Sequence, residues 1–155
     1  MKKLVFAVVI ALVASASFGQ KVNFSGTWNL NKTKSELNDQ FSFAPNTIVV
    51  KHDKKSIELE KHGEMQGNEY TTTDVLTLDG NECENPGFGG STKTSTVKWE
   101  KKAGILTISS TIPLDDGSEV EVIEKLSMDG ENLVVEASAS SSYGDMSEVH
   151  VFDKQ

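Results

Sequence analysis

From residue 47 to the C-terminus, apolar and polar residues alternate with a period of two, which is the pattern of half-buried β-strands. In residues 56–60, for example, Ile57 and Leu59 fall on one face of the predicted strand, and glutamates fall on the other. Asp-Gly pairs, which favour tight hairpin turns, separate several of these runs. The pattern predicts an all-β protein of about eight to ten strands. Since no helix long enough for a crossover intervenes, neighbouring strands are expected to be antiparallel.

A meander of hairpins can close into an up-and-down barrel or fold into a two-sheet sandwich. The barrel is favoured, because closure removes the unpaired edges that a long meander would expose. The side chains expected to point into the barrel are mostly mid-sized and apolar: Ile48, Val50, Ile57, Leu59, Leu76, Leu78, Val97, Trp99, Leu106, Ile108, Val120, Val122, Leu133, Val135, Val149 and Val151. A barrel of this size either fills itself with such side chains or holds one small molecule.

Residues 23–30 are expected to form the first strand, with large apolar side chains on one face. Gly26 lies two residues before Trp28, and a glycine inside a strand indicates a sharp bend or a close backbone approach. The Trp28 ring needs both a pocket and a partner for its N–H group. A Ser/Thr-x-x-Glu pattern at 33–36 then predicts one short helical turn after the first strand, followed by a loop to residue 46.

The N-terminus has the composition of a secretory signal peptide: two lysines, an apolar run over 4–13 and small residues over 14–19. The apolar run of about ten residues is too short to span a bilayer. Cleavage is expected after Ala16 or Gly19, with Gly19 favoured, so that the signal peptide is 1–19 and the barrel domain is 20–155. The mature protein is then expected in the periplasm or outside the cell, without membrane insertion.

The charge balance narrows the range of partners. All 15 basic residues are lysines, and with 23 acidic residues the net charge is −8. This balance argues against nucleic acid and against an anionic membrane surface, both of which are bound through basic patches. Cys83 is the only cysteine, so no intrachain disulfide can form, and its acidic neighbours Glu82 and Glu84 disfavour a reactive thiolate.

The run Phe24-Ser25-Gly26-Thr27-Trp28-x-Leu30-Asn31-x-x-Lys34-Ser35 resembles the opening of small exported bacterial proteins of the lipocalin-like (calycin) superfamily. The resemblance implies a β-barrel in which Trp28 packs at the closed end beneath a cation from the last strand. In this sequence the cation is Lys154 rather than the usual arginine, so Gly26, Trp28 and Lys154 are the expected closure residues. The second lipocalin motif is absent, and a carboxylate site built on interior arginine cannot operate here.

Catalytic and metal-binding motifs are missing from the sequence. No His-x-His, Cys-x-x-Cys or His-Glu-x-x-His spacing occurs, and no Gly-x-Ser-x-Gly elbow occurs. The glycine-rich run 87–91 lacks the lysine and the helix of a phosphate-binding loop. We therefore expect no enzyme activity, no metal and no cofactor.

The leading hypothesis is an exported protein that binds a small apolar or amphipathic ligand inside the barrel. The candidate mouth loops are Asn85–Ser91 and Ser140–Gly144. The candidate ligand-binding residues are Phe88 and Tyr143 at the mouth and Trp99, Leu76, Ile108, Val122 and Val135 in the interior. The alternatives are a protein-interaction module with a filled barrel and, more weakly, a barrel enzyme with a dispersed site. A continuous apolar cavity of about 300 Å³ or more favours the carrier, whereas a packed interior beside an exposed apolar patch favours the interaction module.

Overall fold

The computed structural model describes residues 21–155, so the predicted signal peptide lies outside the described residues. The described chain contains ten strands and one 3-10 helix: β1 (Gly26–Leu30), β2 (Thr47–His52), β3 (Ser56–Met65), β4 (Asn68–Thr77), β5 (Cys83–Pro86), η1 (Phe88–Gly90), β6 (Thr92–Glu100), β7 (Ile105–Pro113), β8 (Glu119–Asp129), β9 (Asn132–Ser141) and β10 (Gly144–Lys154). No helix among residues 21–155 has the length and apolar character needed to cross a bilayer.

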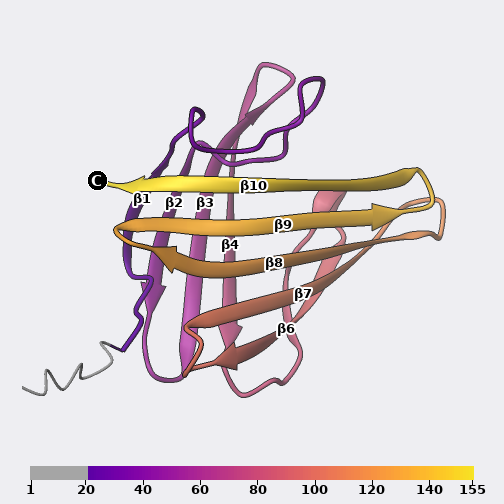
Figure 1. The fold of residues 1–155 in the computed structure, drawn as a ribbon. Helices are drawn as coiled ribbons and strands as arrows, with labels where there is room; N and C mark the ends of the chain where they lie inside the picture. Colours follow the sequence, from indigo (N-terminus) through magenta and orange to yellow (C-terminus); the bar gives the residue numbers. More distant parts are fainter. Residues whose placement is uncertain (1–20) are drawn as a thin grey trace, which may run out of the picture.

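The strands form one antiparallel sheet in the order β4-β3-β2-β1-β10-β9-β8-β7-β6-β5. Neighbouring strands in this order are consecutive in the chain except β1 and β10, which pair in the register Trp28↔Lys154, and the consecutive strands β4 and β5 form the two ends of the order. In Figure 1, β8, β9 and β10 cross in front of β2, β3 and β4 at a steep angle, so the sheet curls round on itself. The predicted all-β, antiparallel up-and-down barrel is confirmed.

The ring is completed between β4 and β5 by side chains. The Asn85 amide accepts a hydrogen bond from the Val75 backbone N–H at 2.9 Å and donates one to the Val75 carbonyl at 3.1 Å. The Thr77 N–H lies 3.3 Å from the Cys83 sulfur. In the described chain, the pairings of these two strands are with β3 and β6, respectively, and not with each other.

Residues 31–46, here named the linker, connect β1 to β2. The linker starts in a hydrogen-bonded turn, in which the Ser35 N–H donates to the Asn31 carbonyl at 3.1 Å and the Asn31 side chain caps the Lys34 N–H. It then continues the pairing of β1 along β10 through the bridge Glu36↔Val149. The linker and the turns at 66–67, 87–91, 114–118 and 142–143 lie at one end of the barrel, the linker end. The N-terminal segment and the turns at 53–55 and 101–104 lie at the other, the N-terminal end.

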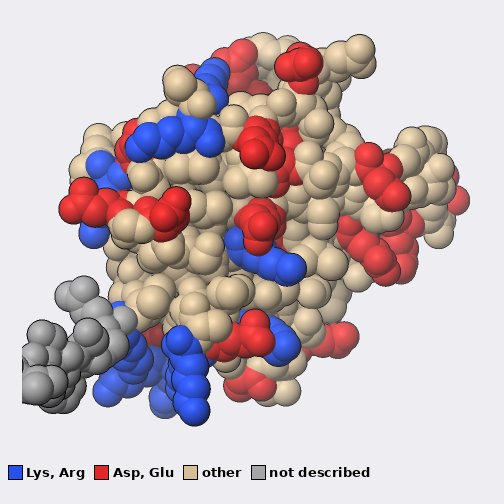
Figure 2. All heavy atoms as spheres, in the orientation of Figure 1, with Lys and Arg blue, Asp and Glu red and all other residues tan. Residues whose placement is uncertain are grey.

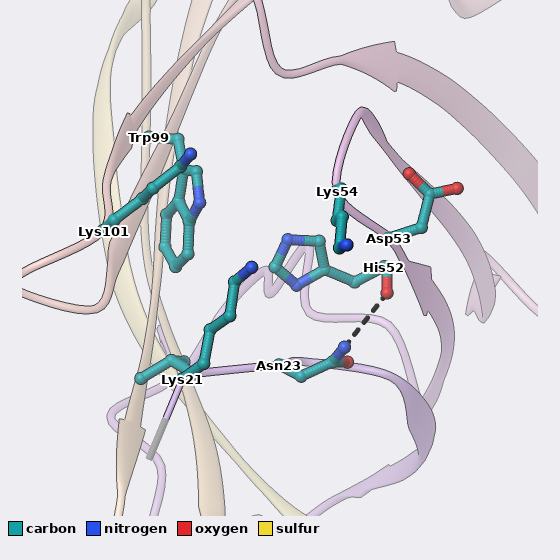
Figure 3. A pocket seen from close by; sticks show the side chains of 8 residues that line it. Lys21, Asn23, His52, Asp53, Lys54, Trp99 and Lys101 are labelled. Carbon is teal, nitrogen blue, oxygen red and sulfur yellow. Dashed lines mark hydrogen bonds between the residues drawn. The ribbon is translucent and has the colours of Figure 1, made fainter. Parts of the chain in front are cut away.

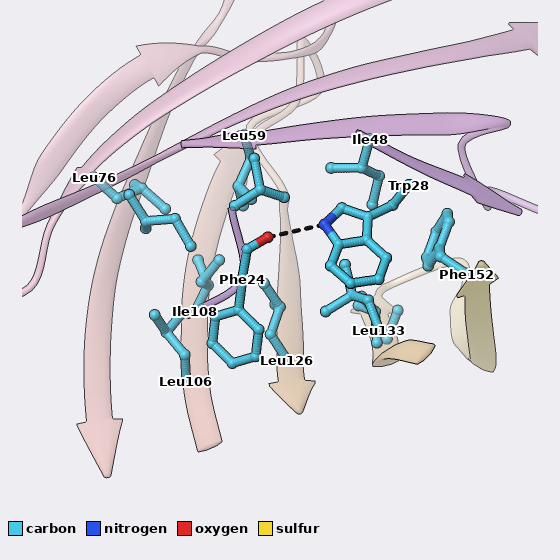
Figure 4. Close-up of a cluster of buried hydrophobic side chains, with 14 of the residues drawn as sticks. Phe24, Trp28, Ile48, Leu59, Leu76, Leu106, Ile108, Leu126, Leu133 and Phe152 are labelled. Atoms are coloured by element: carbon cyan, nitrogen blue, oxygen red, sulfur yellow. Dashed lines mark hydrogen bonds between the residues drawn. The ribbon is translucent and has the colours of Figure 1, made fainter. Parts of the chain in front are cut away.

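A cluster of buried apolar side chains fills the N-terminal half of the barrel (Figure 4). Its largest members, Trp28, Phe24 and Phe152, are at most 1% exposed. The Trp28 indole N–H donates to the Phe24 carbonyl at 2.8 Å, which satisfies the polar atom of the ring. The Lys154 ammonium lies 5.6 Å from the centre of the Trp28 ring. Gly26 makes room for this arrangement, because its φ of +148° is unfavourable for other residues and a Cβ there would lie 3.1 Å from Lys154 Cε.

The direction of the β10 side chains differs from the prediction. Val149 and Val151 were expected to point inward, but they are half-buried on the outer face, where linker residues pair with them. Glu148, His150 and Phe152 point inward and are buried. The sequence of β10 does not show which face is buried, because one face carries two valines and the other carries a histidine and a phenylalanine. The larger Phe152 ring takes the core position beside Trp28.

Candidate functional site

The barrel interior has two chemically different halves. Toward the N-terminal end it is apolar, as described above. Toward the linker end, the inward positions carry polar and charged side chains, here named the interior polar cluster: Lys61, Asp74, Lys93, Ser95, Ser110, Glu124, Glu148 and His150. These residues come from six strands, β3, β4, β6, β7, β8 and β10, and they continue toward the linker end the inward-facing series that are apolar toward the N-terminal end.

The first ion pair of the cluster joins Lys61 on β3 to Glu124 on β8, with 2.5 Å between Nζ and Oε1. The Lys61 side chain is 16% exposed, and the Glu124 side chain is 15% exposed. Burial would lower the pKa of Lys61, but the carboxylates of Glu124 and Asp74 outweigh burial and hold that pKa above its ordinary value. Burial would raise the pKa of Glu124, but the charge and hydrogen bond of Lys61 hold it below its ordinary value. Both groups are therefore charged at neutral pH.

The second ion pair joins Lys93 on β6 to Asp74 on β4. The Lys93 ammonium lies 2.7 Å from the Asp74 carboxylate, and the contact to Oδ2 has the geometry of a hydrogen bond. Asp74 is 4% exposed, and its Oδ1 has no hydrogen-bond partner among the described residues although it also lies near the ammonium. The ion pair with Lys93 compensates the charge of this oxygen, which can still accept a hydrogen bond from a donor that enters the barrel.

Glu148 ties the linker to the barrel. Its carboxylate accepts hydrogen bonds from the Asn38 N–H at 2.9 Å, the Ser42 hydroxyl at 3.1 Å and the Phe43 N–H at 3.3 Å. It also contacts His150 Nε2 at 2.8 Å. Burial would raise the pKa of Glu148, but the hydrogen bonds from Asn38, His150 and Ser42 hold it below its ordinary value.

His150 is neutral in this arrangement. Burial is the main reason that its pKa lies below the ordinary value, although the hydrogen bond to Glu148 opposes the shift. Since an ionised carboxylate can only accept, the neutral ring carries its proton on Nε2 and donates it to Glu148. The Phe43 ring from the linker meets the His150 ring edge to face, with 5.5 Å between ring centres.

The interior polar cluster borders a cavity of about 120 Å³. The linker covers it with Phe43 and Pro45, and the remaining lining comes from the barrel wall: Lys61, Lys93, Ser110, Ile112, Val122, Glu124 and His150. This volume is below the range of pockets that hold drug-sized molecules. With the linker in this position, the cavity accepts only a few non-hydrogen atoms.

The structure separates the predicted ligand-binding residues. Among the predicted interior residues, Val122 lines the cavity, whereas Leu76, Ile108 and Val135 are packed in the apolar half at 2% exposure or less. Trp99 is half-buried at the opposite end of the barrel, where its ring meets those of Phe24 and His52.

The predicted mouth residues both lie at the linker end but point into solvent. Phe88 is 69% exposed, and Tyr143 is 77% exposed. The Tyr143 hydroxyl donates to the carboxylate of Asp116 in the β7–β8 turn, and the hydroxyls of Ser118 and Tyr143 together hold the pKa of Asp116 at about 2. The aromatic residue that covers the cavity is Phe43 of the linker instead.

Sequence reasoning missed the charged interior, because carboxylates on strands were interpreted as solvent-facing. The signal was present in the alternation itself. Continuing Ile57 and Leu59 by two residues reaches Lys61, and continuing Val120 and Val122 reaches Glu124. The charged members of each series therefore face inward together with the apolar ones. Within residues 21–155, no group of three or more histidine, cysteine, aspartate or glutamate side chains is placed to hold a metal ion.

Substituting Glu148 by glutamine is expected to lower the free energy of unfolding at neutral pH by about 2 kcal/mol, because charge-assisted hydrogen bonds to the linker are weakened. The pKa of Glu148 is depressed in the folded state, so its contribution is present above the ordinary value of 4.5 and is lost as the pH falls through the folded value. The variant should therefore lose less stability than the wild type on acidification. Urea unfolding at about pH 7 and about pH 4 measures both values.

The matched control is Glu136→Gln, which changes an exposed carboxylate on the outer face of β9. It should reproduce the pH dependence of the wild type. His150 contributes in the same direction, because its depressed pKa makes protonation below pH 6.5 unfavourable in the folded state. An identical pH dependence in wild type and Glu148→Gln would show that the carboxylate does not anchor the linker.

No protein-family model matches the sequence, and no curated protein matches it. The structure is similar to the crystal structure of zebrafish ileal bile acid-binding protein complexed with cholic acid, with a TM-score of 0.54. The match covers 85% of this chain and 98% of the zebrafish chain, at 16% sequence identity. At this identity the likeness concerns the fold and not the ligand. The described chain therefore shares the antiparallel β-barrel fold of that protein, and its ten strands close into a nearly continuous ring.

Proposed function

We propose that the protein is a binding protein, not an enzyme, and that it takes a small amphipathic molecule into the linker end of the barrel. The observation that carries the proposal is the interior polar cluster around the cavity. Burying two ion pairs costs desolvation energy, and a barrel that only had to be stable would do as well with apolar side chains. Clusters of buried, perturbed titratable groups in a cavity are typical of functional sites.

The chemistry of the cluster favours a ligand with a polar group that both donates and accepts hydrogen bonds, such as a hydroxyl group. Asp74 Oδ1, which lies 2.7 Å from the Lys93 ammonium, can accept a hydrogen bond from the ligand. Lys61 and Lys93 each have N–H groups beyond the one used in their ion pair, and these can donate to the ligand. The apolar part of the ligand would contact Val122 and Ile112 and replace Phe43. A purely apolar ligand would leave the charged groups without compensation, so the amphipathic class is favoured.

The small cavity means that ligand entry requires a change at the linker. The linker is held to β10 by hydrogen bonds to Glu148 and by the packing of Phe43 on His150. Displacing Phe43 joins the cavity to solvent at the linker end. The binding of cholic acid by the zebrafish protein of similar fold supports the choice of an amphipathic ligand but does not identify it.

The protein-interaction alternative has less support. The large apolar side chains that are most exposed lie on five different elements: Phe41 on the linker, Val75 on β4, Phe88 on η1, Ile123 on β8 and Tyr143 in the β9–β10 turn. Single exposed apolar residues are normal on soluble proteins and do not define an interface. Export to the periplasm or beyond, indicated by the N-terminal residues, would suit either function and remains part of the proposal.

The test is a substitution that fills the cavity. Val122→Trp is expected to weaken the binding of a fluorescent fatty acid, cis-parinarate, by at least about tenfold, because the indole occupies the ligand volume. The matched control is Ile123→Trp, since Ile123 is the next residue on β8, points outward and is 41% exposed. It should bind within about twofold of the wild type.

Two further measurements complete the test. Cholate should displace the probe from the wild type, and native mass spectrometry of protein purified from its own host should show a co-purifying small molecule. Equal binding by both tryptophan variants would exclude the cavity as the site. A wild type that neither carries a bound mass nor binds either amphiphile would contradict the proposed function.

A further inference from the structure

A second pocket lies at the N-terminal end of the barrel, away from the interior polar cluster. The N-terminal segment, the β2–β3 turn and the β6–β7 turn enclose a volume of about 390 Å³ (Figure 3). We name it the N-terminal pocket; its lining includes Lys21, Lys54, Lys101, His52, Asp53 and Trp99. It shares no lining residue with the interior cavity and is about three times larger.

The N-terminal pocket collects positive charge on an acidic protein. Three ammonium groups line it, those of Lys21, Lys54 and Lys101, and none of the three forms an ion pair with a residue in 21–155. The whole chain has a net charge of −8. Figure 2 shows several lysine side chains gathered at the lower left of the view, whereas acidic side chains are spread over the rest of that face.

The one carboxylate in the lining is turned toward its own hairpin. Asp53 accepts hydrogen bonds from the Lys55 N–H at 2.7 Å and the Ser56 N–H at 2.8 Å. These backbone hydrogen bonds hold its pKa below the ordinary value. The Asp53 carboxylate therefore stabilises the β2–β3 turn. The three lysine charges of the pocket outnumber this one negative charge.

Two aromatic rings form the apolar wall of the pocket. The Trp99 and His52 rings meet edge to face, with 5.5 Å between their centres and 79° between their planes. Figure 3 shows the Lys21 side chain extending from the N-terminal segment toward the His52 ring. Phe24 packs behind both rings, at 5.9 Å from Trp99 and 5.5 Å from His52, and holds them in place.

His52 adds a neutral donor to the pocket. Its Nδ1 accepts a hydrogen bond from the Phe24 backbone N–H at 3.3 Å. Burial is the main reason that the pKa of His52 lies below its ordinary value. The neutral ring therefore carries its proton on Nε2, the nitrogen that Phe24 does not occupy.

We propose that the N-terminal pocket binds a small organic anion with a flat aromatic part. Its acid group lies among the ammonium groups of Lys21, Lys54 and Lys101, and its flat part lies against Trp99. The volume falls in the range of small-molecule sites, and an indole face suits a planar partner better than a chain. An extended polyanion such as a nucleic acid is disfavoured, because the acidic remainder of the surface repels it.

The experiment maps binding by amide chemical shifts in NMR spectra of ¹⁵N-labelled protein, with naphthalene-2-sulfonate as the probe. The protein is expressed from the full sequence, and its intact mass identifies the N-terminus. Shifts are expected at the backbone amides of 52–54 and 101–102. Methanesulfonate, which has the charge without the ring, and 2-naphthol, which has the ring without the charge, should each bind at least about tenfold more weakly.

Charge-reversed variants provide the matched comparison. Lys54→Glu/Lys101→Glu should weaken binding of naphthalene-2-sulfonate by at least about tenfold, because two favourable charge contacts become repulsive. Lys32→Glu/Lys125→Glu changes the net charge equally at two exposed lysines outside the pocket and should weaken binding by less than about threefold.

Three outcomes would overturn the proposal. Equal weakening by both double variants would show that only the net charge matters. Shifts confined to residues around Lys61 and Glu124 would assign the probe to the interior cavity, and no saturable shifts would show that the pocket binds no such anion. These outcomes are independent of the amphiphile experiment above, because the variants and the shifted amides belong to the opposite end of the barrel.

Discussion

Trp28→Ala is expected to lower the free energy of unfolding by about 3–5 kcal/mol, the range measured for large aromatic side chains removed from cores. Trp28 is 1% exposed and lies between Phe24, Ile48 and the end of β10. The substitution leaves a cavity in the centre of the apolar half and leaves the Phe24 carbonyl without the indole N–H that it accepts from. Urea unfolding followed by circular dichroism measures the loss.

Two control variants separate the contributions of the ring. Trp28→Phe keeps most of the buried volume and should lose clearly less stability than Trp28→Ala. Lys154→Met removes the ammonium over the ring but keeps the apolar stem, and should cost no more than about 1 kcal/mol, the value of an exposed cation–π contact. A loss below about 1 kcal/mol for Trp28→Ala would contradict the view that this ring closes the barrel.

Lys93→Met is expected to lower the free energy of unfolding by about 3–5 kcal/mol, because it leaves the Asp74 carboxylate buried without its cation. Asp74 is 4% exposed, and Lys93 is the residue that hydrogen-bonds to it. Replacing both partners, in Lys93→Met/Asp74→Leu, should recover most of the loss, since no unpaired charge then remains. Urea unfolding of the four proteins in the cycle gives the coupling energy.

The matched control lies on the same strand. Lys98 pairs with Glu100 at 3.3 Å, but its side chain is 75% exposed. Lys98→Met should therefore cost no more than about 0.5 kcal/mol. If Lys93→Met cost as little as Lys98→Met, water would reach Asp74 freely, and the interior polar cluster would not be a desolvated site. That result would also remove the main support for the proposed ligand site.

The fold could be predicted from the sequence because its main features are local. Period-two alternation marks the strands, Asp-Gly pairs mark the turns, and the absence of long helical segments requires antiparallel neighbours. The short β5 and the closure between β4 and β5 could not be predicted in this way. They depend on how the Asn85 side chain meets Val75, ten residues away, and no periodic pattern encodes such a contact.

The candidate site was harder to predict, because its residues break the rule that strands bury apolar side chains. A lysine and a glutamate at inward positions are stable only when they meet, as Lys61 and Glu124 do across 63 residues. Alternation identifies the face of each residue but not the partner on another strand. The residues around the cavity opening were hard to predict for a related reason: Tyr143 bonds to Asp116 on a neighbouring turn, whereas Phe43 reaches the cavity from a segment without regular structure.

The closure between β4 and β5 has a mechanical consequence. Parting any other two adjacent strands breaks a ladder of main-chain hydrogen bonds. Parting these two requires the release of the Asn85 side chain from Val75, the contacts of Thr77 with the Cys83 sulfur, and the ion pair between Lys93 on β6 and Asp74 on β4. Among the described strands, this is the one junction of the ring without a backbone ladder, so we expect the barrel to open first between β4 and β5.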